Sequence, residues 1–352
     1  EEKGFSYELI KKSLQKKIHV ITANKALLSI HGNKLFSIAD DNNVSLMFEA
    51  AVAGGIPIIK TLKQSIYLNK IKRISGIFNG TTNYILTEME KKNLSFNEIL
   101  KQSQNNGFAE SDPTNDIDGI DAAHKLSLLS SLCFSSRINF NNIIYQGIRN
   151  IEIDDIINAE RLGYKIKLLA ESEIINNKLM AVVEPRLIRK NNHLANIDGV
   201  LNAVKIETDH LNPLILEGEG AGGKATASSI ISDLYDVSLG KNVPSLGLPI
   251  NSLKNYDSLD LSNNQSSYYL RILVKDISGV LATITSNLND KGISIETILQ
   301  TPDDKNTNDN IPIIIVTHIT NEKLLMNAVT RIQKLDFVSE KITIIKIDKD
   351  FD

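Results

Sequence analysis

Two long β-like stretches that flank an Asn-Asn pair restrict the fold of this 352-residue chain more than any other feature. KIKLLAESEII covers residues 165–175, KLMAVVEPRLI covers 178–188, and only Asn176 and Asn177 separate them. A two-residue turn of this kind is typical of an antiparallel hairpin, because asparagine tolerates the positive φ angles that the turn requires. We therefore expect an antiparallel sheet in the middle of the chain. Further β-like stretches lie at 142–148, 203–208 and 213–220.

The segments before this sheet alternate between helix and strand. The first expected elements are a helix at 7–15, a strand at 18–23, a helix at 24–39 and a strand at 44–50. This βαβ rhythm predicts a parallel sheet covered by helices. After Pro57 the rhythm changes, and the middle of the chain is predicted to be an α+β domain. Its expected elements are helices at 56–65, 81–92 and 95–107 and a strand at 71–78.

The last part of the chain is predicted to be a separate small domain. Residues 238–266 are rich in Gly, Pro, Asn and Ser, and we expect them to form a linker. Strands and helices then follow in the order βαββαβ over 267–352, with a loop at 302–310. That order is typical of a ferredoxin-like domain.

Composition excludes several kinds of partner. A formal charge of −3, with lysines interspersed among acids, lacks the basic patch of a nucleic-acid-binding protein. No run approaches the roughly 18 apolar residues of a membrane span, and no leader-like segment is expected. Cys133 is the single cysteine, so we predict no disulfide within the chain. The six histidines show no metal-ligand spacing, and we predict no transition-metal site. His124 is expected to be an ordinary helix-face residue. These features predict a soluble, cytoplasmic protein of two or three domains.

The stretch AESDPTNDIDGIDAAHK (109–125) concentrates acidic residues before a single lysine. Asp118 is expected to cap a helix, and Asp121 and Lys125 lie four residues apart on that helix, so that both side chains project from one face. Two interpretations remain open here. Either the acids form a solvated capping loop with Lys125 as a surface partner, or Lys125 is a proton donor that points into a cleft.

The segment GEGAGG (218–223) satisfies G-x-G-x-x-G, follows a predicted strand and precedes a predicted helix. A dinucleotide fingerprint also needs a second strand about twenty residues later that ends in an acid, and here the chain continues into GKNVPSLGLPI (240–250). We therefore favour a tight turn at which the backbone comes close to a ligand or another element. The glycines remain able to face the nicotinamide end of a cofactor.

Five segments together resemble the homoserine dehydrogenase family, and they occur in the family's order. They are TANKALLS (22–29), FEAAVAGGIPIIKTL (48–62), GIFNGTTNYILTEM (76–89), GFAESDPTNDIDGIDAAHK (107–125) and GEGAGGKATASSIISDL (218–234). KDISGVLATIT (275–285) is similar to the first strand-to-helix loop of an ACT domain, as in monofunctional members with that domain at the carboxyl end. The family reduces L-aspartate 4-semialdehyde to L-homoserine with NAD(P)H, reversibly, in threonine, methionine and isoleucine biosynthesis.

The resemblance implies roles for particular residues. Lys125 would be the proton donor and acceptor, positioned by Asp121, and Lys25 would be a second active-site lysine, although without the resemblance it reads as a surface lysine at a helix start. The substrate would be bound by Glu110, which would meet its ammonium group, and by Asp116 and Thr81. A helix-starting threonine is the alternative for Thr81, and it is the more common role. The cofactor, NADP or NAD, would be contacted by Asn24, Lys25, Gly220 and Gly222.

Two further sites follow from the resemblance. A sodium ion would be held by Glu49 and the carbonyl groups of Val52, Gly54 and Ile56, although a glycine-rich turn also forms without an ion. An effector carboxylate, with threonine as the natural candidate, would be received by Asp276, Ser278, Gly279 and Val280. A ligand-free dimerisation module is the alternative for this domain. The family resemblance also implies a homodimer or a higher homo-oligomer.

The implied domains are a Rossmann-type remainder at 1–48 completed by a helix at 225–237, a catalytic and dimerisation domain at 49–224, the linker at 238–266 and the ACT-like domain at 267–352. The family's first strand and its glycine loop have no counterpart here. We therefore expect most of the substrate site but weak or no NAD(P) binding by this chain alone, and an exposed apolar edge on the partial parallel sheet. A non-catalytic, amino-acid-binding or regulatory subunit is the alternative function, and the coding region upstream of Glu1 discriminates between the two.

Overall fold

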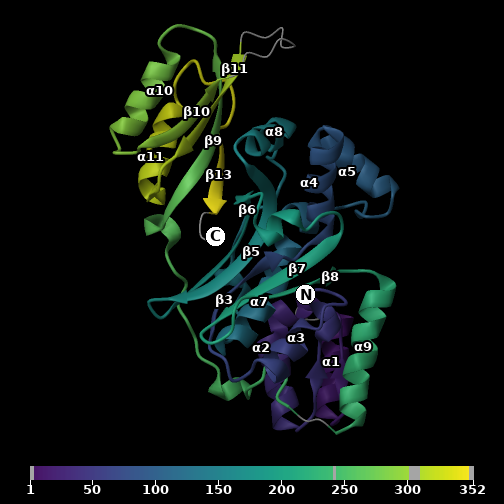
Figure 1. Ribbon diagram of the computed structural model, residues 1–352. Helices are drawn as coiled ribbons and strands as arrows, with labels where there is room; N and C mark the ends of the chain where they lie inside the picture. The colour runs from purple at the N-terminus through teal and green to yellow at the C-terminus, as the bar shows by residue number, and fades with distance from the viewer. Residues whose placement is uncertain (1–3, 241–242, 301–309, 349–352) are drawn as a thin grey trace.

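The computed structural model describes residues 4–240, 243–300 and 310–348, and three parts follow one another along its length (Figure 1). The first part consists of α1 (Phe5–Gln15), β1 (Val20–Ile21), α2 (Lys25–Asp41) and β2 (Leu46–Met47). β1 and β2 pair in parallel, and α9 (Gly223–Ser238) returns to pack beside β1. The predicted parallel sheet with a returning helix is therefore present, although its strands are shorter than expected.

The middle part is an antiparallel sheet covered by helices. Short helical turns lead into it, namely η1 (Glu49–Ala51), α3 (Ile58–Lys60) and η2 (Thr61–Ser65). Its strands are β3 (Ile71–Ile77), β5 (Tyr164–Ile175), β6 (Lys178–Arg189), β7 (Leu201–Thr208) and β8 (Leu214–Glu219), in the order β6-β5-β3-β7-β8. Its helices are α4 (Gly80–Lys92), α5 (Phe96–Asn105), α6 (Thr114–Ile117), α7 (Ile120–Phe134) and α8 (Ile153–Arg161).

The hairpin of β5 and β6 forms as the Asn-Asn pair predicts. All twelve residue pairs from Tyr164↔Arg189 to Ile175↔Lys178 are in register. Asn176 and Asn177 both have positive φ, 49° and 60°, which is the conformation of a two-residue turn that matches the twist of the strands. One face of this hairpin is covered by α7 and α8, and this fixes where the acidic stretch before α7 lies.

The carboxyl-terminal part is the predicted βαββαβ unit. Its elements are β9 (Gln265–Lys275), α10 (Val280–Asn289), β10 (Ile295–Gln300), β11 (Asn310–Thr317), β12 (Thr320–Asn321), α11 (Glu322–Ile332) and β13 (Thr343–Asp348). The strand order β10-β11-β9-β13 is ferredoxin-like, with both helices on one face. Most of the loop expected at 302–310 lies outside the described residues.

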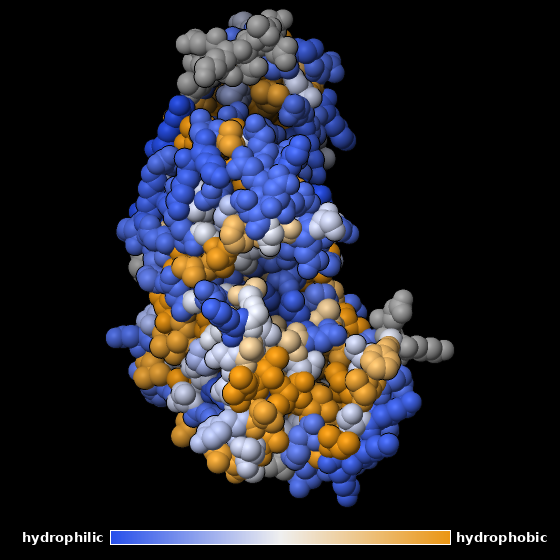
Figure 2. Space-filling model, turned by 90° about the vertical axis from the view of Figure 1, so that its right-hand side faces the viewer, coloured by the Kyte–Doolittle hydropathy of each residue, from blue (hydrophilic) through white to orange (hydrophobic). Residues whose placement is uncertain are grey.

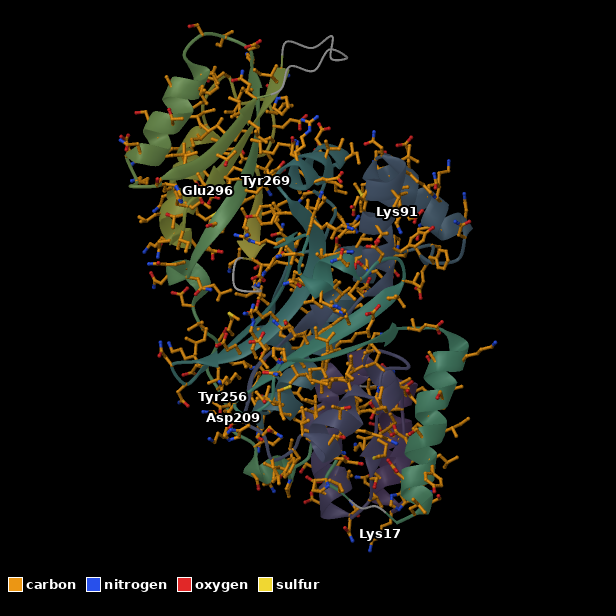
Figure 3. The ribbon with its side chains drawn as sticks, viewed as in Figure 1. Lys17, Lys91, Asp209, Tyr256, Tyr269 and Glu296 are labelled. Atoms are coloured by element: carbon orange, nitrogen blue, oxygen red, sulfur yellow. The ribbon has the colours of Figure 1, made fainter. Side chains whose placement is uncertain are left out.

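This unit is joined to the middle part by a continuous sheet. β13 pairs in parallel with β6, so the two sheets merge into one of eleven strands. Buried charges hold the junction: Arg186 of β6 donates to Asp348 of β13 at 3.2 Å and to Glu171 of β5. A second buried contact joins β9 to α8: the fully buried Asp155 of α8 accepts from Arg271 at 2.8 Å and from Tyr269 at 3.0 Å. Tyr269 is labelled in Figure 3. The unit is therefore docked through buried ion pairs as well as strand pairing.

Several expected elements differ from the structure. The strand expected at 142–148 shrinks to β4 (Ile144–Tyr145), which pairs with β6. Asn142 belongs to η3 (Phe140–Asn142), and the other residues of the stretch are in no helix or strand. Residues 238–266 are not a free linker where they are described, because Ile250 and Leu253 are buried against the first and middle parts. Other short turns are η4 (His193–Asn196), η5 (Ile250–Ser252) and η6 (Leu261–Asn263).

The expected capping role of Asp118 is wrong. α7 begins at Ile120 after Gly119, which has a φ of 83° and therefore ends α6 and starts α7 through a left-handed turn. Asp118 instead pairs with Arg149 at the surface.

The lower part of one face of the molecule carries many apolar side chains (Figure 2). Figure 2 shows apolar side chains gathered over the lower part, where α9 lies in Figure 1. The exposed members on α9 and just after it are Ile230, Ile231, Leu234, Tyr235 and Leu239. None of the described helices combines the length and apolar character needed to cross a membrane.

Candidate active site

A pocket of about 760 Å³ lies between the first part of the chain and the middle part. Its wall is formed by the start of α2, the start of α4, the loop before α6, the first turns of α7 and the turn between β8 and α9. All the residues predicted to be catalytic or to bind substrate line it, together with two of the glycines predicted to face the cofactor: Lys25, Thr81, Glu110, Asp116, Asp121, Lys125, Gly220 and Gly222. The fold thus brings together residues that are up to 197 positions apart, from Lys25 to Gly222.

Asp121 is the centre of the charged cluster in this pocket. Its Oδ1 lies 3.1 Å from the Nζ of Lys25 and its Oδ2 lies 2.8 Å from the Nζ of Lys125. Burial alone would raise the pKa of Asp121, but the two ammonium groups outweigh it and hold that pKa well below the ordinary value of 3.8. Asp121 is therefore a carboxylate at neutral pH, and it orients both lysines.

Lys125 is buried and its ammonium group is directed by two acceptors. Besides Asp121, the carbonyl oxygen of Phe78 accepts from Nζ at 2.6 Å. An ammonium group has three N–H donors, so these contacts leave one donor for a group that enters the pocket. Phe78 follows the last residue of β3, and sequence reasoning did not identify its carbonyl, because a backbone acceptor leaves no trace in the residue type.

Asn79 is a further functional residue that the sequence analysis missed. Its Nδ2 donates to Asp116 at 2.7 Å and to Asp121 at 2.9 Å, while its Oδ1 accepts from the backbone N–H of Thr82 at 2.8 Å. One buried amide therefore caps α4 and holds two carboxylates in place. The available signal was an asparagine directly before the helix-starting residues GTTN, which indicates a cap but not the carboxylates it holds.

The other predicted substrate residues surround this network. Burial, with the nearby Asp121 charge, raises the pKa of Asp116 above 3.8, although the bond from Asn79 opposes the rise. Thr81 donates its hydroxyl hydrogen to the carbonyl of Phe108 at 3.1 Å, and its backbone lies in the first turn of α4, where N–H groups have no acceptor within the helix. Glu110 is exposed and lines the pocket rim.

The glycine motif forms a tight turn, as favoured from the sequence. A side chain at Gly220 would collide with Asn202, because an added Cβ would lie 2.1 Å from its Cγ. A side chain at Gly54 would collide with the carbonyl of Gly220 at 2.6 Å, so two backbone segments meet here without side chains between them. Gly222, in contrast, borders open space beside the pocket. Asn24 does not line the pocket wall; its side chain caps α2 by accepting from Leu27 at 3.0 Å.

The loop predicted to hold sodium has hydrogen-bond partners of its own. Both carboxylate oxygens of Glu49 accept backbone N–H groups at 2.9 Å, from Ile59 and Lys60, and the carbonyl of Gly54 accepts from Ser229 at 2.7 Å. Burial raises the pKa of Glu49 from 4.5 to about 7. Each of these oxygens keeps a second lone pair, so the bonds occupy only part of the acceptor capacity of Glu49 and Gly54. Sodium binding stays a prediction.

His124 is not an ordinary helix-face residue. Its Nδ1 lies 2.5 Å from the hydroxyl oxygen of Ser29 on α2, and its ring stacks on Phe140 with 4.3 Å between centroids. Burial lowers the pKa of His124 below 6.5, against the attraction of Asp121. Its contact to α2 lies one turn beyond Lys25, so it links the two helices that carry the active-site lysines.

A second pocket, of about 530 Å³, lies in the carboxyl-terminal unit. Asp276, Gly279 and Val280, three of the four residues predicted to bind an effector, line it together with residues of β10 and β11. Gly279 has a φ of 91° and precedes α10 directly. The predicted strand-to-helix loop therefore borders a cavity large enough for an amino acid.

Comparisons with known proteins place these features in one family. The family model "Homoserine dehydrogenase" matches residues 57–235, and the model "ACT domain" matches residues 268–337. A homoserine dehydrogenase of Neisseria gonorrhoeae is 40% identical over 351 residues, which are 98% of this chain and 80% of that protein.

Solved structures agree. A homoserine dehydrogenase from Thiobacillus denitrificans superimposes with a TM-score of 0.90 at 39% identity, covering 98% of this chain and 79% of that one. A hyperthermophilic archaeal homoserine dehydrogenase in complex with NADPH superimposes with a TM-score of 0.58 at 31% identity, covering 66% of this chain and 68% of that one.

Proposed function

The chain belongs to the homoserine dehydrogenase family of NAD(P)-dependent oxidoreductases, and we propose that the pocket around Asp121 is where it interconverts L-aspartate 4-semialdehyde and L-homoserine. The observation that carries this proposal is the buried pair of Asp121 and Lys125, 2.8 Å apart, with one ammonium donor left for the pocket. A binding protein has no need of a proton donor held in this way.

The reaction requires a proton at one oxygen atom. NAD(P)H, when bound, supplies the hydride that reduces the aldehyde carbon. The carbonyl oxygen then becomes an alkoxide, and the free N–H of Lys125 donates to that oxygen as the charge develops and delivers the proton. In the reverse direction neutral Lys125 accepts the hydroxyl proton of homoserine. Asp121 stays ionised and orients Lys125, and Lys25 adds positive charge on the opposite oxygen of that carboxylate.

The two ends of the amino-acid substrate find complementary groups in the pocket. The carboxylate of Glu110 receives the ammonium group of the substrate, and the carboxylate of Asp116 accepts a hydrogen bond from the substrate. The first-turn N–H groups of α4, at Gly80 and Thr81, lie on the pocket wall and suit the substrate carboxylate, because a helix N-terminus favours an anion. This arrangement keeps the aldehyde end near Lys125 and the charged end near α4.

The pocket also suits the reactive end of a nicotinamide cofactor. Lys25 at the start of α2 and the glycines at 220 and 222 border its open side, where no side chain at Gly222 blocks the approach. The archaeal relative in complex with NADPH supports NAD(P)H as the hydride donor. The choice between NADP and NAD, the strength of cofactor binding by this chain and the assignment of Asn24 stay predictions. So do a homo-oligomeric state and a cytoplasmic location.

The test is to follow reduced nicotinamide by its absorbance with homoserine and NADP or NAD. For Lys125→Ala we expect turnover to fall by about 10²–10⁴, the usual contribution of a positioned acid or base. Lys91→Ala is a matched control, because this lysine lies on the surface of α4 (Figure 3) and its loss leaves the pocket intact. Near-normal turnover of the Lys125 variant would remove that residue from the mechanism.

For the ACT domain we propose an amino-acid effector at the pocket beside Gly279. Asp276 suits an effector ammonium group and the N-terminus of α10 suits its carboxylate. Threonine is the candidate. If millimolar threonine changes neither thermal stability nor turnover of the wild type, this assignment is wrong, and the dimerisation role remains.

A further inference from the structure

Asn202 of β7 is a buried amide for which the described part of the chain provides no hydrogen-bond partner. Its side chain is 0% exposed, and neither Oδ1 nor Nδ2 is bonded. Buried amides almost always have partners, because burial removes the water that would otherwise satisfy them. The amide of Asn202 therefore has a donor and an acceptor that neighbouring polar groups can bond.

The position of Asn202 suggests where a partner comes from. The side chain lies directly behind two glycines of the active-site wall. A Cβ added to Gly220 would lie 2.1 Å from both Cγ and Nδ2 of Asn202, and a Cβ added to Gly80 would lie 3.6 Å from its Oδ1. Gly220, in the turn before α9, and Gly80, at the N-terminus of α4, both line the pocket, so the amide lies next to the backbone of the pocket wall.

The turn before α9 has one fixed end and one free end. At the fixed end the backbone N–H of Gly55 donates to the carbonyl of Glu219 at 3.0 Å. At the free end Gly222 has φ 112° and ψ 146°, a conformation that is essentially restricted to glycine, and a side chain there would meet nothing within 4 Å. Residues 221–224 are exposed. A short movement of the exposed backbone from Ala221 onward is therefore possible without displacing packed side chains, while Gly220 stays next to Asn202.

We propose that Asn202 is a positioning residue for this turn, and that its amide is bonded by the peptide groups of Gly220 and Ala221 when substrate occupies the pocket. Nδ2 then donates to a peptide carbonyl and Oδ1 accepts a peptide N–H. The proposal rests on the proposed function, which supplies the ligand. Because these bonds form only in the occupied state, they add to ligand affinity and hold the turn over the substrate.

The test is Asn202→Leu, which keeps the number and branching of the side-chain heavy atoms and removes both polar atoms. Thermal unfolding of the chain is measured with and without L-homoserine in the presence of NADP, and the dissociation constant of homoserine is obtained from the titration. For the free variant we expect a midpoint about 1–3 °C above the wild type, because an unsatisfied amide has been removed. For homoserine we expect about tenfold weaker binding, the equivalent of the lost bonds.

Ser267→Ala is the matched control, because Ser267 is also buried with an unpartnered hydroxyl but lies on β9, away from this pocket. It should leave homoserine binding unchanged. If the Leu variant is less stable than the wild type when free and binds homoserine as tightly, the amide already has its partners and the proposal is overturned. Higher stability with unchanged homoserine affinity overturns the ligand-linked role alone. A wild type that shows no homoserine-induced shift refutes the proposed function, and the role of Asn202 falls with it.

Discussion

Replacing Asp121 by Asn tests the charge at the centre of the active site while keeping its shape. The carboxylate lies within 3.1 Å of both lysine ammonium groups, and Lys125 is buried while Lys25 is about one-third exposed. Removing one member of a buried ion pair costs about 3–5 kcal/mol, because the partner charge stays buried without compensation. Since Lys25 retains contact with water, we expect the lower end, about 3 kcal/mol of unfolding free energy, together with a fall in turnover of about 10²–10⁴.

The loss of stability should depend on pH in a defined direction. The two lysines hold the pKa of Asp121 below 3.8, so its contribution is present above that pH and is lost as the pH falls through the depressed pKa. Chemical denaturation at neutral and acidic pH measures this: the Asn variant should differ most from the wild type at neutral pH and converge with it in acid. Asp118→Asn is the control, because its surface pair with Arg149 contributes about 0–1 kcal/mol. Equal effects of the two substitutions at neutral pH would refute the central role of Asp121.

Three other outcomes are expected. Burial raises the pKa of Glu49 from 4.5 to about 7, so protonated Glu49 stabilises the wild type below pH 4.5 and this contribution is lost as the pH rises toward 7. Glu49→Gln should abolish this fall in stability. Denaturation midpoints measured from pH 4.5 to 7 check it, and the same pH dependence in the variant and the wild type contradicts it. Gly220→Ala should lower the unfolding free energy by about 1–3 kcal/mol, because the added methyl group overpacks against Asn202. Asn202→Ala in the same chain should restore part of this loss, which a double-mutant cycle of thermal unfolding measures. If the effects of the two substitutions simply add, the two residues are not in contact. Asp155 is fully buried and bonded to Arg271, so Asp155→Asn should loosen the carboxyl-terminal unit. Limited proteolysis should then cut the segment 238–266 faster than in the wild type. An unchanged cleavage pattern excludes this docking role of Asp155.

Local features of the fold were predictable because they depend on neighbours in sequence. The Asn-Asn turn, the βαββαβ order and the capping residue Ser95 of α5 all follow from short-range rules that the structure obeys. The union of the two sheets was not predictable. The apolar pattern of the strand at 343–348 fits pairing with the edge of any sheet. The ion pair that joins Asp348 to Arg186 spans 162 positions of the chain. No local pattern identifies such a partner.

The candidate site divides in the same way. Asp121 and Lys125 stand four residues apart on one helix, so their pairing could be inferred from the sequence. The roles of Asn79 and the Phe78 carbonyl required knowledge of how β3 ends beside α7. His124 was misjudged because its partner Ser29 lies 95 positions away, on a helix whose packing no periodicity reveals.

The continuous sheet gives the ACT domain a physical connection to the active site. β13 pairs with β6, β6 with β5 and β5 with β3, and β3 ends at the carbonyl that binds Lys125. Contact alone does not make a regulator, because an effector shifts an equilibrium only by its difference in affinity between two arrangements. A buried cluster of ion pairs joins β13 to β6, β5 and β3, so two arrangements of the ACT domain would differ at this cluster. Its members are Arg73, Glu171, Arg186 and Asp348. Charges buried together tolerate few geometries, so a movement of β13 must either carry β3 with it or break these pairs, and the second course is costly. We therefore expect an effector that moves β13 to shift β3 and, with it, the carbonyl of Phe78 that accepts from Lys125.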